Sequence, residues 1–299
     1  MKRIWLCLVF VAAVAACLWP GQSPNAVAQR QPFDPRTMPR KNRQSGGPLI
    51  FYHGGPIMTG SSNHVYVIYY GDFAATTTNI IDTFLENVGG SGAFNVNSTY
   101  YNAQDQFIQN KLAYHHADDS YYDVNSLGAK LPNDFAVQLL QSVLSGGFLP
   151  TDTQAIYLEI ISPDVTVPNG NYCGYHTHST TVVSGQDIKY AVVPDPGPKH
   201  YDCSGNVAIF NENNSPNDDI GADSVCDTLI HELSETVTDP DLNAWYGPKG
   251  EDGDLCNFNY GTTFTAPNGT HANQMFGGLD YLVQTIWENS GNGFCANSL

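Results

Sequence analysis

The chain has 299 residues and a strong excess of acidic side chains, with 29 Asp and Glu against 12 Lys and Arg and a formal net charge of −17 at pH 7. All its arginines lie at or before Arg43, so residues 45–299 carry five lysines, 28 acidic residues and a formal charge of −23. A body with this charge repels phosphate backbones and anionic lipid headgroups, and it lacks the guanidinium groups that bind phosphate in bidentate fashion. The composition therefore argues against nucleic acid as a partner and suits cations or neutral glycans.

The N-terminus has the pattern of an export signal. A basic start precedes an apolar run from Ile4 to Leu18, and Ala26-Val27-Ala28 forms a small-x-small cleavage site. We therefore expect residues 1–28 to be a signal peptide and the secreted chain to start near Gln29. The run is too short for a membrane span. A lipobox-like VAAC sequence ending at Cys17 leaves a lipid anchor as the alternative.

The rest of the chain divides into a polar segment and one domain. Residues 29–48 contain proline and no hydrophobic periodicity, which predicts a disordered linker or short pro-segment. Residues 49–299 contain no further linker and are the length of one large domain.

Within this domain, strands and helices are expected to alternate. Runs of β-branched and aromatic residues predict strands over 64–70, 155–162, 188–193 and, more weakly patterned, 207–210. Amphipathic spacing predicts helices over 76–88 and 133–144, and a helix or mixed segment over 102–115. This order indicates an α/β (α+β) fold, a single domain with a central mixed sheet flanked by helices.

The next helix carries the candidate chemistry. Apolar residues recur at every fourth position from Val225 to Val237, and Pro240 ends the pattern. His231 and Glu235 then lie one above the other on the opposite face, as an HExxE sequence. Such a pair can chelate a metal ion, and Glu232 is then free to take a proton from metal-bound water. The pattern is that of the zinc-peptidase HExxH helix with Glu as the second ligand, which predicts a zincin-like site. An ordinary amphipathic helix is the alternative.

A third metal ligand is expected from the chain that follows this helix. Glu251 and Asp254 lie in an acidic loop that Cys256 anchors, and either would complete a three-ligand zinc site with an open position. Asp241 is a third candidate, because it follows His231 by ten residues, the spacing at which metzincin helices supply their third ligand. The sequence leaves the choice open.

Two further stretches are weighed as cation sites. His176 and His178 are two residues apart, so in a strand they share a face and could bind a metal, with ordinary polar roles as the alternative. Residues 211–223 are rich in oxygen donors, but they lack the EF-hand order of ligands, so Ca²⁺ suits them less than helix capping by Asp219 does.

Five cysteines remain after export, and an oxidising compartment favours pairing. Cys226 lies on the apolar stripe of the HExxE helix, where a buried free thiol is expected. The least crossed pairing of the other four is Cys173–Cys203 and Cys256–Cys295.

Several segments carry a family resemblance. They are residues 52–56 (YHGGP) with 59–60 (TG), 65–71 (VYVIYYG), 173–176 (CGYH), 236–240 (TVTDP) and a C-terminal block over 282–295. Their order resembles the phosphate-induced protein family, also called EXORDIUM-like, over most of residues 50–299. The match looks closest to bacterial members, whose helix similarly reads HE-x-x-E. The resemblance implies secretion. Plant members are secreted cell-wall proteins linked to growth, and they lack the His-Glu pair.

Two functions from different classes follow. The first is an exported zinc-dependent hydrolase acting on peptides, with His231, Glu235 and a loop carboxylate as ligands and Glu232 as general base. The second is a non-catalytic extracellular or cell-envelope protein, meeting peptide or cell-wall glycan, in which the cluster holds a structural cation or none. Because the domain has no arginine, His53, His176 or His178 or the metal itself would have to bind a substrate anion.

Overall fold

The structure is a computed structural model that describes residues 49–170, 172–197 and 201–299. The expected signal peptide, the lipobox alternative at Cys17 and the expected linker over 29–48 lie outside the described residues. No helix in the described residues is both long enough and apolar enough to cross a membrane.

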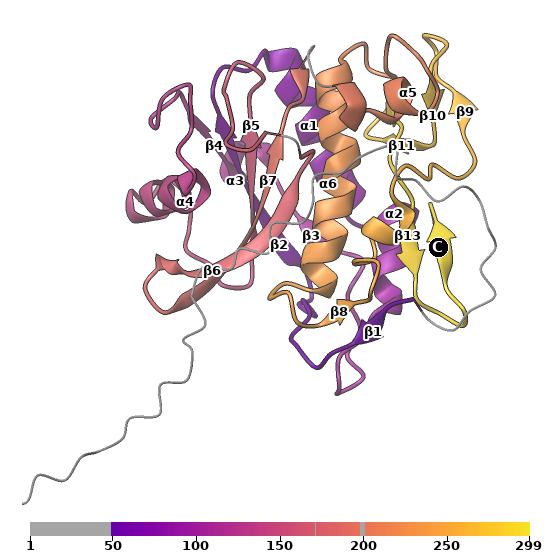
Figure 1. The fold of residues 1–299 in the computed structure, drawn as a ribbon, viewed down its shortest axis with the longest axis horizontal. Coiled ribbons are helices and arrows are strands. Elements are labelled where there is room, and N and C mark those ends of the chain that lie inside the picture. Colours follow the sequence, from indigo (N-terminus) through magenta and orange to yellow (C-terminus); the bar gives the residue numbers. More distant parts are fainter. Residues whose placement is uncertain (1–48, 171, 198–200) are drawn as a thin grey trace, which may run out of the picture. The chain divides into compact units, whose positions relative to one another are not determined.

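A six-stranded mixed sheet forms the centre of the fold (Figure 1). Its strand order is β3-β2-β5-β7-β6, and β4 also pairs with β2. The strands are β2 (Asn63–Tyr70), β3 (Leu112–Ala113), β4 (Ser120–Asp123), β5 (Ile156–Ile161), β6 (Tyr175–Val183) and β7 (Gln186–Pro194). All neighbouring pairs are parallel except β6 with β7, which are antiparallel. The expected mixed sheet is therefore confirmed.

Helices cover both faces of this sheet, and the inner strands are apolar on both faces for that reason. Helix α4 (Phe135–Ser145) packs on one face, against Tyr66, Ile68 and Tyr70 of β2. Helices α1 (Ala75–Val88) and α6 (Ile220–Thr238) pack on the other, against Val65, Val67 and Tyr69. Figure 1 shows α4 apart from the α1 and α6 pair. This second layer carries the candidate site.

Helix α6 begins earlier than its apolar spacing indicates, at Ile220. The Asp219 side chain accepts a hydrogen bond from the backbone N–H of Ala222 at 3.1 Å, which is the expected capping role. The helix ends at Thr238, one residue before Asp239 and two before Pro240.

Short elements make up the remainder. The helices are α2 (Gly92–Asn95), η2 (Val96–Thr99), α3 (His116–Asp119), η4 (Tyr201–Cys203), α5 (Gly205–Ala208) and η5 (Asp254–Cys256). The strands are β1 (Phe51–Tyr52), β8 (Trp245–Tyr246), β9 (Phe264–Thr265), β10 (His271–Ala272), β11 (Gln274–Phe276), β12 (Leu279–Tyr281), β13 (Ile286–Glu288) and β14 (Phe294–Ala296), paired as four two-stranded antiparallel sheets, β1 with β8 and the others each with the next strand.

Two expected elements differ. The strand expected over 207–210 is wrong, because these residues end α5 and form a turn; so short an apolar run has no period that separates strand from helix. The segment 102–115 is mixed and not helical. Its start is held by the side chain of Asn102, which accepts hydrogen bonds from the backbone N–H groups of Gln104 and Gln106 and so competes with a helix.

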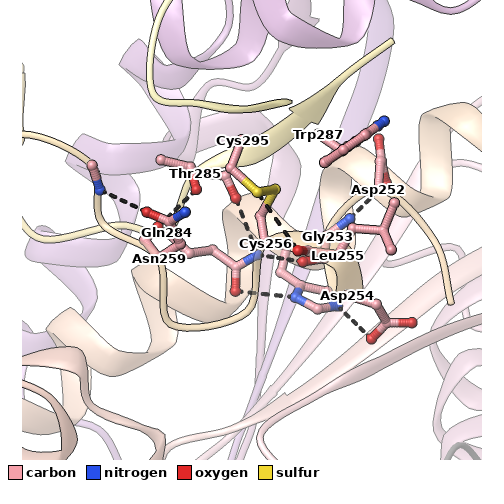
Figure 2. The surroundings of a disulfide bond; sticks show 12 residues. Asp252, Gly253, Asp254, Leu255, Cys256, Asn259, Gln284, Thr285, Trp287 and Cys295 are labelled. Atoms are coloured by element: carbon pink, nitrogen blue, oxygen red, sulfur yellow. Dashed lines mark hydrogen bonds and ion pairs between the residues drawn. A yellow bond between two sulfur atoms is a disulfide. The ribbon is translucent and has the colours of Figure 1, made fainter. Parts of the chain in front are cut away.

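The cysteine assignment is confirmed. Cys173 is bonded to Cys203, Cys256 is bonded to Cys295, and Cys226 is a buried free thiol. The second bridge joins η5 to β14 and thereby anchors the acidic loop of residues 251–254 to the C-terminal hairpin (Figure 2).

Candidate metal centre

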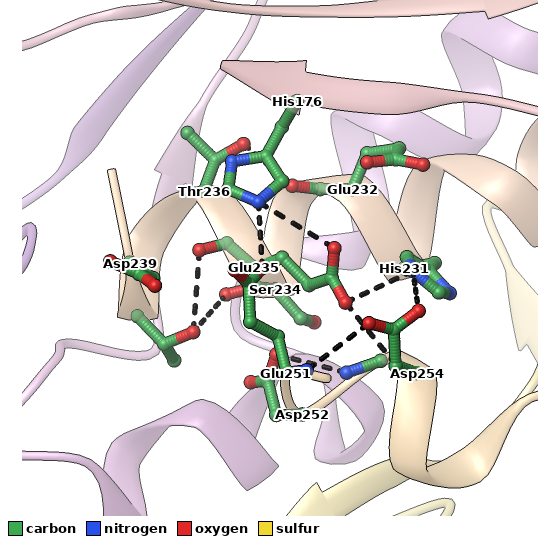
Figure 3. A network of polar contacts seen from close by, with 12 residues as sticks. His176, His231, Glu232, Ser234, Glu235, Thr236, Asp239, Glu251, Asp252 and Asp254 are labelled. Carbon is green, nitrogen blue, oxygen red and sulfur yellow. Dashed lines mark hydrogen bonds and ion pairs between the residues drawn. The ribbon is translucent and has the colours of Figure 1, made fainter. Parts of the chain in front are cut away.

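Helix α6 brings the first two candidate ligands together. His231 Nε2 lies 3.1 Å from Glu235 Oε1, one helical turn away, as the spacing predicts. An ordinary amphipathic helix would present this polar face to solvent. In this protein the face is covered, and Glu235 is only 1% exposed. Strand β6 and the loop over 251–254 cover this face of α6 (Figure 3). A carboxylate this deeply buried requires a compensating positive charge or hydrogen bonds.

Strand β6 supplies a histidine that was not among the main candidates. His176, 5% exposed, points from β6 toward α6. Its Nε2 lies 2.7 Å from Glu251 Oε2 and 3.6 Å from Glu235 Oε2. The signal in the sequence was the His-x-His pair, which cannot reveal that one of its members reaches the HExxE helix.

The loop over 251–254 contributes both of its candidate carboxylates, on different sides. Glu251 faces His176, whereas Asp254 Oδ1 lies 3.8 Å from His231 Nε2. The backbone N–H of Asp254 also donates to Glu235 Oε1 at 3.2 Å. We refer to His176, His231, Glu232, Glu235, Glu251 and Asp254 together as the Glu235 centre.

The same loop fixes the imidazole of His231 by close packing. A Cβ atom at Gly253 would lie 2.8 Å from His231 Cγ and Cδ2, which is closer than real Cβ contacts. Only glycine therefore allows the loop to approach the ring. The disulfide Cys256–Cys295 and the bond from Trp287 N–H to the Asp252 carbonyl at 3.1 Å keep the loop in this position (Figure 2).

The side chain of Gln284 orients the ring of His231. Its amide nitrogen donates to the Gly253 carbonyl at 3.0 Å, so its oxygen faces His231 Nδ1 at 3.2 Å and accepts a hydrogen bond. Nδ1 therefore carries a proton, and Nε2 is the atom directed at Glu235. Asp227, one turn earlier in α6, accepts from the Gln284 backbone N–H at 2.7 Å and holds Gln284 in place.

The carboxylates around His231 favour a proton on its imidazole. Burial alone lowers the pKa of His231, but the charges of Glu235, Glu232 and Asp254 outweigh it and hold this pKa well above the ordinary value. Burial and the charge of Glu235 likewise raise the pKa of Asp252 well above its usual range. A metal ion would replace the imidazole proton, since a coordinating histidine must be neutral.

The donor atoms of the centre fall into two groups that could each hold a metal ion. His176, Glu235 and Glu251 form one group, and His231, Glu232 and Glu235 form the other. Within each group the donor atoms lie within 4.8 Å of one another. Imidazole nitrogen and carboxylate oxygen are donors that zinc accepts, so both groups fit this metal chemically.

Asp241 lies in a different cluster from His231. It groups with His178 and Asp187, and Lys189 Nζ lies 3.0 Å from Asp187 and 3.4 Å from Asp241. The lysine ammonium already supplies the positive charge between these carboxylates. The structure therefore brings Glu251 and Asp254, but not Asp241, to the Glu235 centre.

Two remaining candidates, His53 and the loop over 211–223, do not belong to the Glu235 centre. His53 is exposed and stacks on Tyr246 with 3.7 Å between ring centroids. The oxygen-rich loop over 211–223 caps α6 through Asp219, and none of the metal-ligand groups found among the described residues falls in it.

Comparisons with known proteins agree on one family. Residues 50–295 match the model described as the phosphate-induced protein 1 conserved region. Protein EXORDIUM-like 5 of Arabidopsis thaliana is 26% identical over 315 residues, covering 88% of this chain and 84% of the relative. Protein EXORDIUM-like 3 of the same plant is 25% identical over 276 residues, covering 80% of each. No solved structure matches the chain significantly.

Proposed function

Since the chain belongs to the phosphate-induced protein 1, or EXORDIUM-like, family, we propose that it is an exported metal-binding protein and that its Glu235 centre is a zinc-dependent hydrolase site acting on peptides. Two disulfides among the described residues support export, because such bonds persist in oxidising compartments. Cell-wall glycan is the alternative partner.

One observation carries the metal proposal. The Nε2 atoms of His176 and His231 both approach the carboxylate of Glu235, at 3.6 and 3.1 Å, inside the protein. Two imidazoles and several carboxylates that converge at a buried point are costly without a cation. In a metal-bound protein the same groups become ligands, which offsets that cost.

The chemistry proposed for the site assigns a separate role to Glu232. Zinc supplies Lewis acidity and lowers the pKa of a coordinated water molecule. Glu232 belongs to the same donor group as His231 and Glu235, so its carboxylate is close enough to accept the proton of an attacking water. Asp254 and His231, whose side chains are 23% and 13% exposed, mark the side from which a substrate would enter.

The test separates binding from catalysis. Purified mature protein is loaded with Zn²⁺, freed of excess metal and assayed against a fluorogenic peptide library, in parallel with Glu232→Gln. We expect Glu232→Gln to keep its zinc and lose hydrolysis, because only the proton acceptor is removed. His231→Ala is expected to lower both zinc content and hydrolysis. Unchanged hydrolysis in Glu232→Gln would refute the assigned base.

A non-catalytic protein with a structural cation is the second candidate, and burial favours it. Glu235, Glu251 and His176 are all nearly inaccessible to solvent, as in structural sites that keep no open position. This candidate predicts that wild-type protein binds zinc, that His231→Ala lowers the melting temperature and that no peptide is cleaved.

A further inference from the structure

The two oxygens of the Glu235 carboxylate have different partners. Its Oε2 faces His176, and through His176 it is linked to Glu251. Its Oε1 faces His231 and accepts from the backbone N–H of Asp254. In Figure 3 the carboxylate of Glu235 lies between the imidazoles of His176 and His231, and Glu251 and Asp254 lie below it. Each oxygen of one carboxylate is therefore directed at a different imidazole.

A single metal ion fits this arrangement poorly. Two donors bound to one zinc ion at about 2.1 Å cannot be more than about 4.2 Å apart. The two donor groups of the centre share Glu235, and neither of them contains both His176 and His231. One ion could thus take the ligands of one group only, and the histidine of the other group would keep no metal.

The charge balance of the centre also favours two metal ions over one. Four carboxylates belong to the centre, those of Glu232, Glu235, Glu251 and Asp254, and its two histidines are neutral when they bind metal. One divalent ion would leave two negative charges uncompensated in a largely buried site. Two divalent ions match the four carboxylates.

We propose that the Glu235 centre binds two divalent first-row metal ions bridged by the carboxylate of Glu235. The first ion is held by His176, Glu251 and Oε2 of Glu235. The second is held by His231, Oε1 of Glu235 and Asp254, and Glu232 beside this ion keeps the role of base. A shared carboxylate sets such ions about 3.5–4 Å apart, as in two-metal hydrolytic sites. This inference rests on the proposed metal function and adds the number of ions and their assignment.

The first measurement is the number of zinc ions per chain, taken by elemental analysis of folded protein after loading with Zn²⁺ and gel filtration. We expect two ions in the wild type and one in either His176→Ala or His231→Ala. His178→Ala is the matched control, since this histidine lies on the same face of β6 but pairs with Asp187, and it should keep two.

The second measurement starts from the wild type and covers the case in which His176→Ala fails to fold. Wild-type protein loaded with Mn²⁺ should show the electron paramagnetic resonance spectrum of a spin-coupled pair, and Glu251→Gln should convert it to that of an isolated ion. One zinc ion in the wild type, together with an uncoupled Mn²⁺ spectrum, would overturn the two-ion inference and leave the proposed function intact. A wild type that binds no zinc at all would overturn both.

Discussion

Glu159 is a buried carboxyl whose protonation should control stability. It lies in the middle of β5, opposite Ile68 of β2 and Val192 of β7, and it is 0% exposed. Neither of its carboxylate oxygens has a hydrogen-bond partner in the described part of the chain. Burial therefore raises the pKa of Glu159 well above the ordinary value, so the folded protein holds this proton at pH values where the unfolded chain has begun to lose it.

The raised pKa of Glu159 sets the sign and the size of its effect on the pH dependence of stability. In the unfolded chain the group ionises with a pKa of about 4.3. Its contribution to stability is therefore fully present below that pH and is lost as pH rises toward the raised pKa of the folded state. Within this window the folded state holds one more proton, so the free energy of unfolding falls by about 1.4 kcal/mol per pH unit.

Glu159→Gln removes this titration with little change in shape. Urea unfolding of both proteins at several pH values between 4.5 and 7 should give curves whose difference changes by about 1.4 kcal/mol per pH unit, in favour of the variant as pH rises. The other buried carboxyls are common to both proteins and cancel. Glu159→Leu should gain further at pH 7, because no polar atom then stays buried without a partner. Parallel pH curves for wild type and Glu159→Gln would show that Glu159 has no raised pKa in the folded protein.

Further predictions concern the cysteines, the loop and the pH dependence of metal binding. A thiol reagent under denaturing, non-reducing conditions should label Cys226 only, and label on Cys256 or Cys295 in peptide mapping would contradict the pairing. Removing either bridge, with sequence separations of 30 and 39 residues, should cost on the order of 3 kcal/mol in denaturant unfolding. Gly253→Ala places a Cβ against the His231 ring and should weaken zinc binding by about tenfold or more in a chelator competition, whereas Gly60→Ala, at an exposed glycine whose added Cβ comes no closer than 3.0 Å to its neighbours, should leave it unchanged. Zinc affinity should fall as pH decreases below the raised pKa of His231, because a proton then competes for Nε2, and pH-independent affinity would exclude His231 as a ligand.

The sequence predicts the parts of this structure that depend on local periodicity. The four-residue repeat from Val225 to Val237 places His231 and Glu235 on one face of α6, and Cys226 on the buried one. The disulfide pairing follows from that placement, because Cys226 is removed from the set before the remaining cysteines are paired. These inferences need only the geometry of one helix.

The positions of His176 and Asp241 depend on how distant segments pack, so the geometry of one helix could not predict them. His176 joins the centre because β6 lies against α6, which brings His176 to Glu235, 59 positions later in the sequence. Asp241 follows His231 at the right spacing, yet the Asp239 carboxylate accepts from the backbone N–H groups of Asn243 and Ala244 and turns the chain after the helix. After this turn, Asp241 lies 3.4 Å from Lys189 Nζ. Spacing alone carries no information about such a turn.

Elemental analysis of the purified mature protein decides whether Glu235 holds metal. Wild type and Glu235→Gln are exposed to Zn²⁺ under the same conditions, freed of unbound metal and compared at equal concentrations of folded protein. The proposed centre predicts zinc in the wild type and its loss in Glu235→Gln, because both donor groups share this carboxylate. No zinc in the wild type, or equal zinc in the two proteins, would contradict it.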